Sequence, residues 1–286
     1  MTTQDAIRVL QRIATALEEM VPKPKPPADI KNSDAYVWNA EEKNLIPVEY
    51  PESMDIKLLQ GIDEARDTLL ANTIQFSKGF PANNVLLWGA RGMGKSSLIK
   101  AVHAHINQQN PRSLVLVEIH REDIASLPQL IQTLRGWVIR RFIIFCDDLS
   151  FDSNDSSYKS LKSVLDGGIE GRPAHILFYA TSNRRHLMAR EMIENESNAA
   201  IHGGEPLEEK VSLSDRFGLW IGFYSCSQDT YLNIVEAYVK RYKLDISPED
   251  LKKKAIEWQI TRGARSGRVA WQFIQDLAGK MGKKLL

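Results

Sequence analysis

A glycine-rich turn between two apolar segments constrains the fold of this chain most. The apolar residues 85–88 run into residues 89–96, Gly-Ala-Arg-Gly-Met-Gly-Lys-Ser, and an apolar helical pattern follows. The turn matches the G-x-x-x-x-G-K-[ST] pattern of a phosphate-binding loop (Walker A). Glycines let the backbone curl so that successive N–H groups point at one anion, and the helix start adds unpaired donors. Since a strand precedes the loop and a helix follows it, we interpret residues 89–96 as a nucleotide phosphate site.

Two side chains of this loop have separate predicted roles. The Lys95 ammonium can reach the β- and γ-phosphates, and the Ser96 hydroxyl can ligate Mg²⁺. A chance glycine-rich turn is the alternative, and the strand–loop–helix order disfavours it. The complete predicted nucleotide-binding loop consists of Gly89, Ala90, Arg91, Gly92, Met93, Gly94, Lys95, Ser96 and Ser97.

A pair of acids follows one strand–helix unit downstream. The apolar residues 142–146 end in Asp147 and Asp148, the pattern of a Walker B strand. Beside a phosphate-binding loop, Asp147 can hold Mg²⁺ through water while Asp148 polarises the attacking water. An isolated Asp pair more often caps a strand end. Its place after the loop favours the hydrolytic role.

Strand and helix patterns alternate through most of the chain. Helical patterns occur between the strands and before the first of them, where one region is broken by Gly61, and residues 36–51 resemble an irregular covering segment. This alternation predicts an α/β fold with a mainly parallel sheet between helices, and the phosphate-binding loop makes the expected fold class that of a P-loop NTPase. The five predicted strands are residues 85–88, 114–119, 141–146, 175–179 and 219–224.

The two ends of the chain differ from this body. Residues 3–21 show apolar spacings of three and four, which predict an amphipathic helix that packs on the body or docks to a partner. A proline-rich stiff linker follows it. After residue 230 only helical patterns occur. The expected domains are residues 1–27 (N-terminal helix and linker), 28–228 (nucleotide-binding core) and 229–286 (an all-helical module).

Composition excludes some function classes. The formal net charge of +1 gives no global attraction to nucleic acid or membranes, although residues 236–286 hold twelve Lys or Arg against six Asp or Glu. Cys146 and Cys226 lie in apolar runs and indicate buried thiols in a reducing cytosol. No apolar run approaches the length of a membrane span. We expect a cytoplasmic protein with no membrane partner.

The motifs together resemble the AAA+ ATPase superfamily, and more closely a bacterial family of predicted AAA+ ATPases catalogued as a domain of unknown function. The likeness extends over residues 55–280. Five segments in order carry it: residues 83–92 (NNVLLWGARG), 145–151 (FCDDLSF), 180–188 (ATSNRRHLM), 212–219 (SLSDRFGL) and 263–268 (GARSGR).

This resemblance implies further site residues. Asn183 would be sensor 1, orienting the lytic water with Asp148. Arg216 would be an arginine finger for a neighbouring subunit's γ-phosphate, and Arg268 would be sensor 2, reaching from a helical lid. Ile62 would lie against adenine. Near equivalents that the sequence leaves open are Arg184, Arg185, Arg262 and Arg265. The resemblance thus implies ATP, Mg²⁺ and a homo-oligomer.

The chain departs from the family pattern in two places. The second acid is usually Glu; Asp148 is one methylene shorter, which predicts slower hydrolysis. The place of the aromatic–aliphatic–Gly pore loop reads HREDIAS, residues 120–126, and this counts against a protein-threading unfoldase.

Three functions remain open at this point. The first is an ATPase that remodels or assembles an unidentified protein partner. The second is a slow ATP switch or loader, for which hydrolysis only times release. The third is an initiator-like factor associated with DNA, supported only by the basic C-terminal module, in which no nucleic-acid-binding motif is present.

Overall fold

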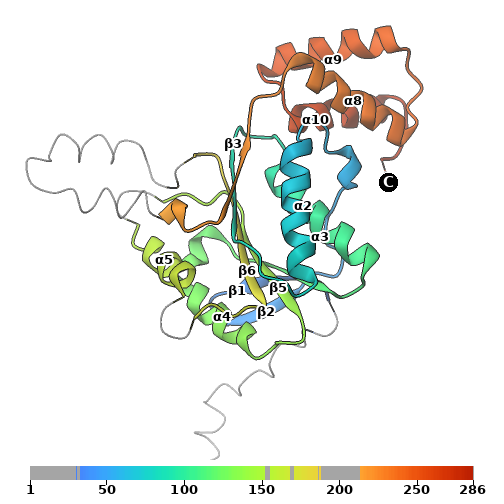
Figure 1. Cartoon of the computed structure of the whole chain (residues 1–286). Coiled ribbons are helices and arrows are strands. Elements are labelled where there is room, and N and C mark those ends of the chain that lie inside the picture. Colours follow the sequence, from blue (N-terminus) through green and yellow to red (C-terminus); the bar gives the residue numbers. More distant parts are fainter. Residues whose placement is uncertain are drawn as a thin grey trace, which may run out of the picture.

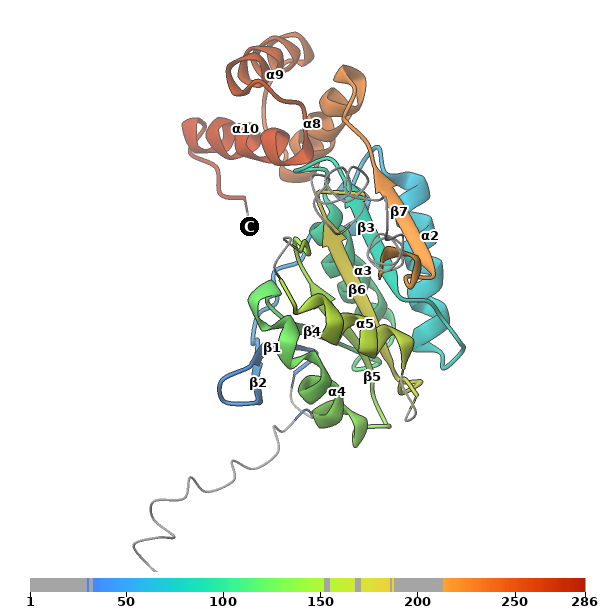
Figure 2. The same ribbon diagram turned by 90° about the vertical axis from the view of Figure 1, so that its left-hand side faces the viewer.

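The computed structural model describes residues 30, 33–151, 155–167, 171–185, 187 and 213–285. In this part of the chain, seven strands form one sheet in the order β2-β1-β4-β5-β6-β3-β7 (Figures 1 and 2). The β1–β2 pair is antiparallel and the other described pairs are parallel. The strands are β1 (Ala35–Asn39), β2 (Asn44–Pro47), β3 (Val85–Gly89), β4 (Leu114–Glu118), β5 (Arg141–Cys146), β6 (Ile176–Ser182) and β7 (Leu219–Phe223).

Helices cover both faces of this sheet. The helical elements are η1 (Ile56–Leu58), α2 (Asp63–Ser77), α3 (Lys95–Gln109), η2 (Arg121–Ser126), α4 (Leu127–Arg135), α5 (Tyr158–Asp166), α8 (Gln228–Tyr242), α9 (Pro248–Arg262) and α10 (Gly267–Lys280). None of the described helices is long and apolar enough to cross a membrane. The predicted N-terminal helix at residues 3–21 lies outside the described residues.

The α/β prediction is confirmed, and the sheet has two strands more than the five expected. The additional strands form the β1–β2 hairpin at one edge, where residues 36–51 were expected to be irregular. Trp38 of β1 is buried, and its indole N–H donates to Ser126 Oγ at 2.8 Å. Since β1 is held by its parallel pairing with β4, far away in sequence, local periodicity did not reveal it.

Alternation along the strands separates two apolar cores. In β3, Val85 and Leu87 face the core that contains α2, α3 and the C-terminal helices. Leu86, between them, faces the core that contains α4 and α5. Figure 2 shows α4 and α5 in front of the sheet, with α2 and α3 behind it. Successive side chains of β3 therefore lie on opposite faces of the sheet, so the position of a residue in the strand tells which core it faces.

The three C-terminal helices stand above the carboxyl ends of the strands (Figure 1). Each of them begins at a serine whose hydroxyl accepts a backbone N–H three residues later, an ordinary helix cap. These serines are Ser227, Ser247 and Ser266. The module packs on the core at Gly61 (φ +74°), where an added Cβ would lie 2.2 Å from Thr230 Cγ2. The break expected at Gly61 therefore separates η1 from α2 and also makes room for α8.

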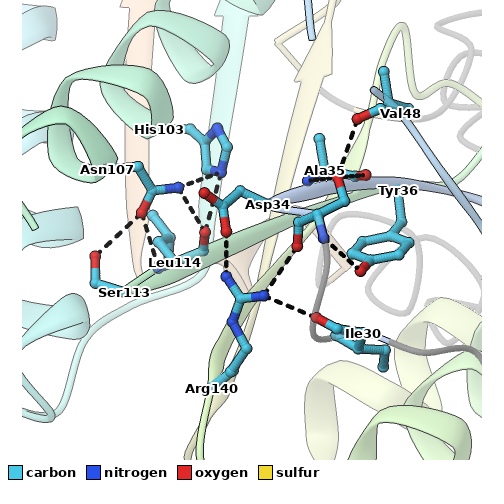
Figure 3. A network of polar contacts seen from close by, with 11 residues as sticks. Ile30, Asp34, Ala35, Tyr36, Val48, His103, Asn107, Ser113, Leu114 and Arg140 are labelled. Carbon is cyan, nitrogen blue, oxygen red and sulfur yellow. Dashed lines mark hydrogen bonds and ion pairs between the residues drawn. The ribbon is translucent and has the colours of Figure 1, made fainter. Parts of the chain in front are cut away.

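The amino-terminal edge of the sheet carries a polar network, which we call the entry cluster (Figure 3). Arg140 donates to the carbonyl oxygens of Ile30 and Ser33, each at 2.9 Å, and pairs with Asp34. Next to it, two side chains of α3 bind the start of β4. His103 Nε2 lies 3.2 Å from the Leu114 carbonyl oxygen, and Asn107 binds both the N–H and the C=O of Leu114. The entry cluster consists of Asp34, His103, Asn107, Leu114 and Arg140.

Candidate nucleotide-binding site

The glycine-rich loop joins β3 to α3, and two of its glycines are required by geometry. Gly89 has φ +122°, and an added Cβ would lie 2.1 Å from the carbonyl oxygen of Phe223 in β7. The same carbonyl accepts the Ala90 N–H at 2.8 Å, so that the loop begins in contact with β7. Gly94 caps α3 in the left-handed conformation with φ +89°. Only glycine adopts these conformations without strain.

Lys95 is buried at the base of the loop. Its Nζ donates to the carbonyl oxygens of Gly89 and Ala90, each at 2.9 Å, and to Asn183 Oδ1 at 3.1 Å. Burial lowers the pKa of Lys95, and the nearby carboxylates of Asp147 and Asp148 oppose that shift. The ammonium is thus held by the loop itself, at the start of α3, where a phosphate would bind.

Asp147 follows β5 and meets two hydroxyl groups. Ser96 Oγ and Thr181 Oγ1 each donate to Asp147 Oδ1 at 2.5 Å. A hydroxyl and a carboxylate oxygen are ligands that Mg²⁺ prefers, and Mg²⁺ keeps several waters besides. No group of three or more metal-ligating His, Cys, Asp or Glu occurs among the described residues. The oxygen donors at Ser96 and Asp147 fit a magnesium ion bound to a nucleotide.

Asp148 and Asn183 lie at the ends of neighbouring strands and touch. Asn183 Nδ2 donates to Asp148 Oδ1 at 2.5 Å, and the Asp148 N–H donates to Thr181 Oγ1 at 2.9 Å. Asp148 has φ +49°, a left-handed conformation that Asp tolerates better than most residues. The carboxylate of Asp148 remains exposed to solvent. Asn183 therefore contacts both the lysine and the second acid.

Thr181 is a site residue that the sequence reading did not single out. Its hydroxyl joins the backbone after β5 to the carboxylate of Asp147. One signal was available, because Thr181 precedes Asn183 by two residues and side chains two apart share a face of a strand. We call Lys95, Asp147, Asp148, Thr181 and Asn183 the loop cluster.

The C-terminal helices reach the loop through the first turn of α10. The Arg268 N–H donates to the Gly92 carbonyl oxygen at 3.1 Å, and an added Cβ on Gly92 would lie 3.2 Å from Arg268 Cβ. The Arg268 side chain is exposed. On the side of η1, buried Ile62 approaches Gly94, whose added Cβ would lie 4.0 Å from Ile62 Cδ1. Ile62 and Arg268 therefore both adjoin the loop.

The chain matches the model of the family described as "Protein of unknown function (DUF815)" over residues 31–281. This match covers most of the 286 residues. The chain belongs to the DUF815 family. A search of curated proteins finds no match to this chain.

Solved structures show the fold of this DUF815 chain. The Aeropyrum pernix ORC1 protein in complex with DNA is 11% identical, with a TM-score of 0.53 and coverage of 82% of this chain and 71% of that chain. The FIGL-1 AAA domain in complex with ADP is 18% identical, with a TM-score of 0.50 and coverage of 82% and 76%. The RuvB Holliday junction branch migration motor of Thermotoga maritima is 14% identical, with a TM-score of 0.45 and coverage of 80% and 85%. The chain therefore shares its fold with the ORC1 protein and the FIGL-1 AAA domain.

Arg216 of the DUF815 chain lies apart from the loop cluster. Its Nε binds Asp166 Oδ1 at 2.5 Å, at the last residue of α5 on the opposite face of the sheet from α3. Among the four alternative arginines, Arg185 stacks on Trp88 with its guanidinium carbon 5.3 Å from the ring centroid, and Arg262 stacks on Trp258 at 4.9 Å. Arg184 and Arg265 are exposed. Arg184 and Arg185 line a cleft together with Gly89, Ala90 and Arg91 of the loop, whereas Arg216 and Arg262 have partners elsewhere.

Proposed function

We propose that this DUF815 protein binds ATP with Mg²⁺ at the Walker A loop and hydrolyses it to ADP and phosphate. The observation that carries the proposal is the position of Asn183, whose amide oxygen accepts from Lys95 while its amide nitrogen donates to Asp148. One side chain thereby fixes the distance between the phosphate-binding lysine and the candidate base. In a hydrolase the attacking water lies between the base and the γ-phosphate that the lysine holds.

Each residue then has a defined task. Lys95 and the loop N–H groups hold the β- and γ-phosphates, and Ser96 with Asp147 would hold Mg²⁺. Bound there, Mg²⁺ would supply positive charge against the charge that develops on the phosphates. Asp148 orients the water and accepts its proton, while Asn183 holds the carboxylate in place. Ile62 would border the adenine, and Arg268 would reach the phosphates from the lid.

We further propose that Arg216 acts on the ATP of a neighbouring subunit in a homo-oligomer. Its position away from its own loop supports this, because an arginine that stabilises the transferring phosphoryl group has to come from another chain if its own cannot supply it. We also propose that the domain boundaries lie after residues 27 and 228. The proposed location of the protein is the cytoplasm. The unidentified partner would be a macromolecule that lid movement remodels or assembles.

A mixing experiment tests the trans arrangement. Arg216→Ala and Asp148→Asn should each retain ATP binding and lose turnover. In an equal random mixture, about a quarter of the interfaces would pair an intact Asp148 with an intact Arg216 from the next subunit, so turnover should partly return. No recovery at any mixing ratio would refute the trans arginine, and normal turnover of Asp148→Asn alone would refute its role as base.

The slow ATP switch is the second candidate, and the short side chain of Asp148 favours it. Asp148→Glu should then raise basal turnover, with Asp147→Glu as the matched control that lowers it. Basal hydrolysis measured without any partner decides between the two functions, since fast turnover of the wild-type protein would eliminate the switch. A threading unfoldase is disfavoured, because Ile124 of the 120–126 segment is fully buried and Ser126 is bonded to Trp38.

A further inference from the structure

A cleft of about 610 Å³ is lined in part by the first residues of the Walker A loop, Gly89, Ala90 and Arg91. Three of its ten lining residues are arginines and none is a carboxylate. Three aromatic residues also line it: Trp88 near the end of β3, Phe223 at the end of β7 and Tyr224 directly after it. The residues that matter for its chemistry are Trp88, Arg91, Arg184, Arg185 and Tyr224.

The aromatic side of this cleft lies on the opposite face of the sheet from α3. Leu87 packs in the core that contains α3, so the next residue, Trp88, points to the other face. Tyr224 meets it there, with ring centroids 6.0 Å apart in an edge-on arrangement. The phosphate cradle around Lys95 belongs to the α3 side. The aromatic side of the cleft therefore lies outside the phosphate cradle, although the cleft shares Gly89, Ala90, Arg91 and Asn183 with the predicted nucleotide site.

The fold makes room for this aromatic pair. Gly222 of β7 stands next to Trp88 in the strand pairing, and an added Cβ would lie 3.0 Å from Trp88 Cζ2 and 3.2 Å from Tyr224 Oη. Arg185 places its guanidinium carbon 5.3 Å from the Trp88 ring centroid, a cation–π contact. Tyr224 is nevertheless 74% exposed. The pair thus offers an aromatic surface to solvent between arginine side chains.

We propose that this cleft binds single-stranded nucleic acid. An exposed aromatic ring stacks on bases, and arginines bind the backbone phosphates, which is how proteins bind single strands without reading their sequence. An acidic peptide would pair with the arginines but would leave the exposed Tyr224 without a role. The charge of the lining, with three arginines and no carboxylate, fits a polyanion. This inference does not depend on ATP hydrolysis.

The cleft differs from the basic C-terminal module, which was the only support for DNA binding in the sequence. Among the described residues of that module, Lys252, Lys253 and Lys254 lie on the exposed side of α9. The nearby Trp258 is stacked by Arg262. A cluster of lysines gives phosphate attraction alone, whereas the cleft combines charge with aromatic stacking.

Fluorescence anisotropy with a labelled oligothymidylate and the full-length protein at low salt tests the proposal. Tyr224→Ala should weaken binding about tenfold or more, and Tyr224→Phe should keep most of it, because the ring carries the stacking. Arg185→Ala should weaken binding and lower the slope of log K against log salt by about one. The matched control Lys253→Ala should change affinity less than twofold.

Four outcomes would overturn the proposal, the last of them in the competition assay. The first is the absence of binding at low salt. The second is equal weakening by Lys253→Ala and Tyr224→Ala. The third is displacement of the oligonucleotide by ATP·Mg²⁺ one for one, which would place it on the phosphate loop. Oligouridylate, duplex DNA and poly-glutamate serve as competitors: single strands of either sugar should compete, and stronger competition by the duplex or by poly-glutamate would refute single-strand binding.

Discussion

The entry cluster and the loop cluster occupy opposite edges of the same sheet and use their polar groups differently. At the amino-terminal edge, Arg140 and Asn107 bind backbone carbonyl and amide groups, which ties distant chain segments together. At the carboxyl edge, the carboxylates of Asp147 and Asp148 are bound by side chains and still face solvent. Helix α3 contributes to both clusters. A cluster of polar side chains therefore does not by itself indicate a reactive site. Carboxylates that remain exposed to solvent do.

The largest expected effect comes from Lys95→Ala. This change removes the ammonium that would pair with the phosphates, so ATP affinity should fall on the order of a hundredfold or more. Isothermal titration calorimetry with ATP·Mg²⁺ measures it, and Lys100→Ala on the same helix is the control. Unchanged ATP affinity would refute the assignment of the loop.

Arg140→Ala should lower the stability of the fold and leave ATP affinity unchanged, the opposite of Lys95→Ala. It leaves Asp34 and two carbonyl oxygens without their donor, so the free energy of unfolding should fall by about 2–3 kcal/mol, or roughly 5 °C in Tm. ATP affinity at a temperature where the variant is folded should not change. Thermal unfolding compared with the exposed Lys159→Ala provides the check. A stable variant with reduced ATP affinity would show that the entry cluster is not purely structural.

Thr181→Val tests whether the loop cluster needs its supporting hydroxyl. The methyl group replaces the donor to Asp147 and the acceptor for the Asp148 N–H, so turnover or apparent Mg²⁺ affinity should fall about tenfold or more. The Tm should fall by only about a few degrees, because valine fills nearly the same space and the loss is limited to the two hydrogen bonds of one hydroxyl. Thr181→Ser retains the hydroxyl and should restore most of the turnover. Equal loss in both variants would indicate a packing effect.

The smallest effect concerns pH and His103. Burial lowers the pKa of His103 below its ordinary value of 6.5; Asp34 opposes the shift and Arg140 adds to it. The unfolded chain therefore binds a proton more readily than the folded chain. Below about pH 6.5 the free energy of unfolding should fall, by at most about 1.4 kcal/mol per pH unit.

Denaturant unfolding at several pH values measures this slope. His103→Gln should reduce it, and His105→Gln, on the same helix, serves as the control. If the slope is the same in both variants, acid destabilisation originates elsewhere.

The sequence predicted those parts of the molecule that depend on local patterns. The five strands of the core and the all-helical C-terminal module followed from periodicity. The β1–β2 hairpin did not follow, because its burial depends on pairing with β4. The Trp88–Tyr224 contact likewise depends on the register of β3 on β7, and Thr181 gains its partners only when β5 and β6 lie side by side.

The hydrogen bond from the Arg268 N–H to the Gly92 carbonyl oxygen joins the first turn of α10 directly to the backbone of the phosphate loop. The helix has 14 residues, so it extends about 21 Å from this contact. If α10 tilted about its contact with Gly92, the far end of the helix would move further than its first turn. Because both partners of this hydrogen bond are backbone groups, proline is the only substitution at position 268 that removes the N–H donor. Arg268→Ala would thus remove the side-chain charge and keep the backbone hydrogen bond to Gly92, whereas Arg268→Pro would remove both.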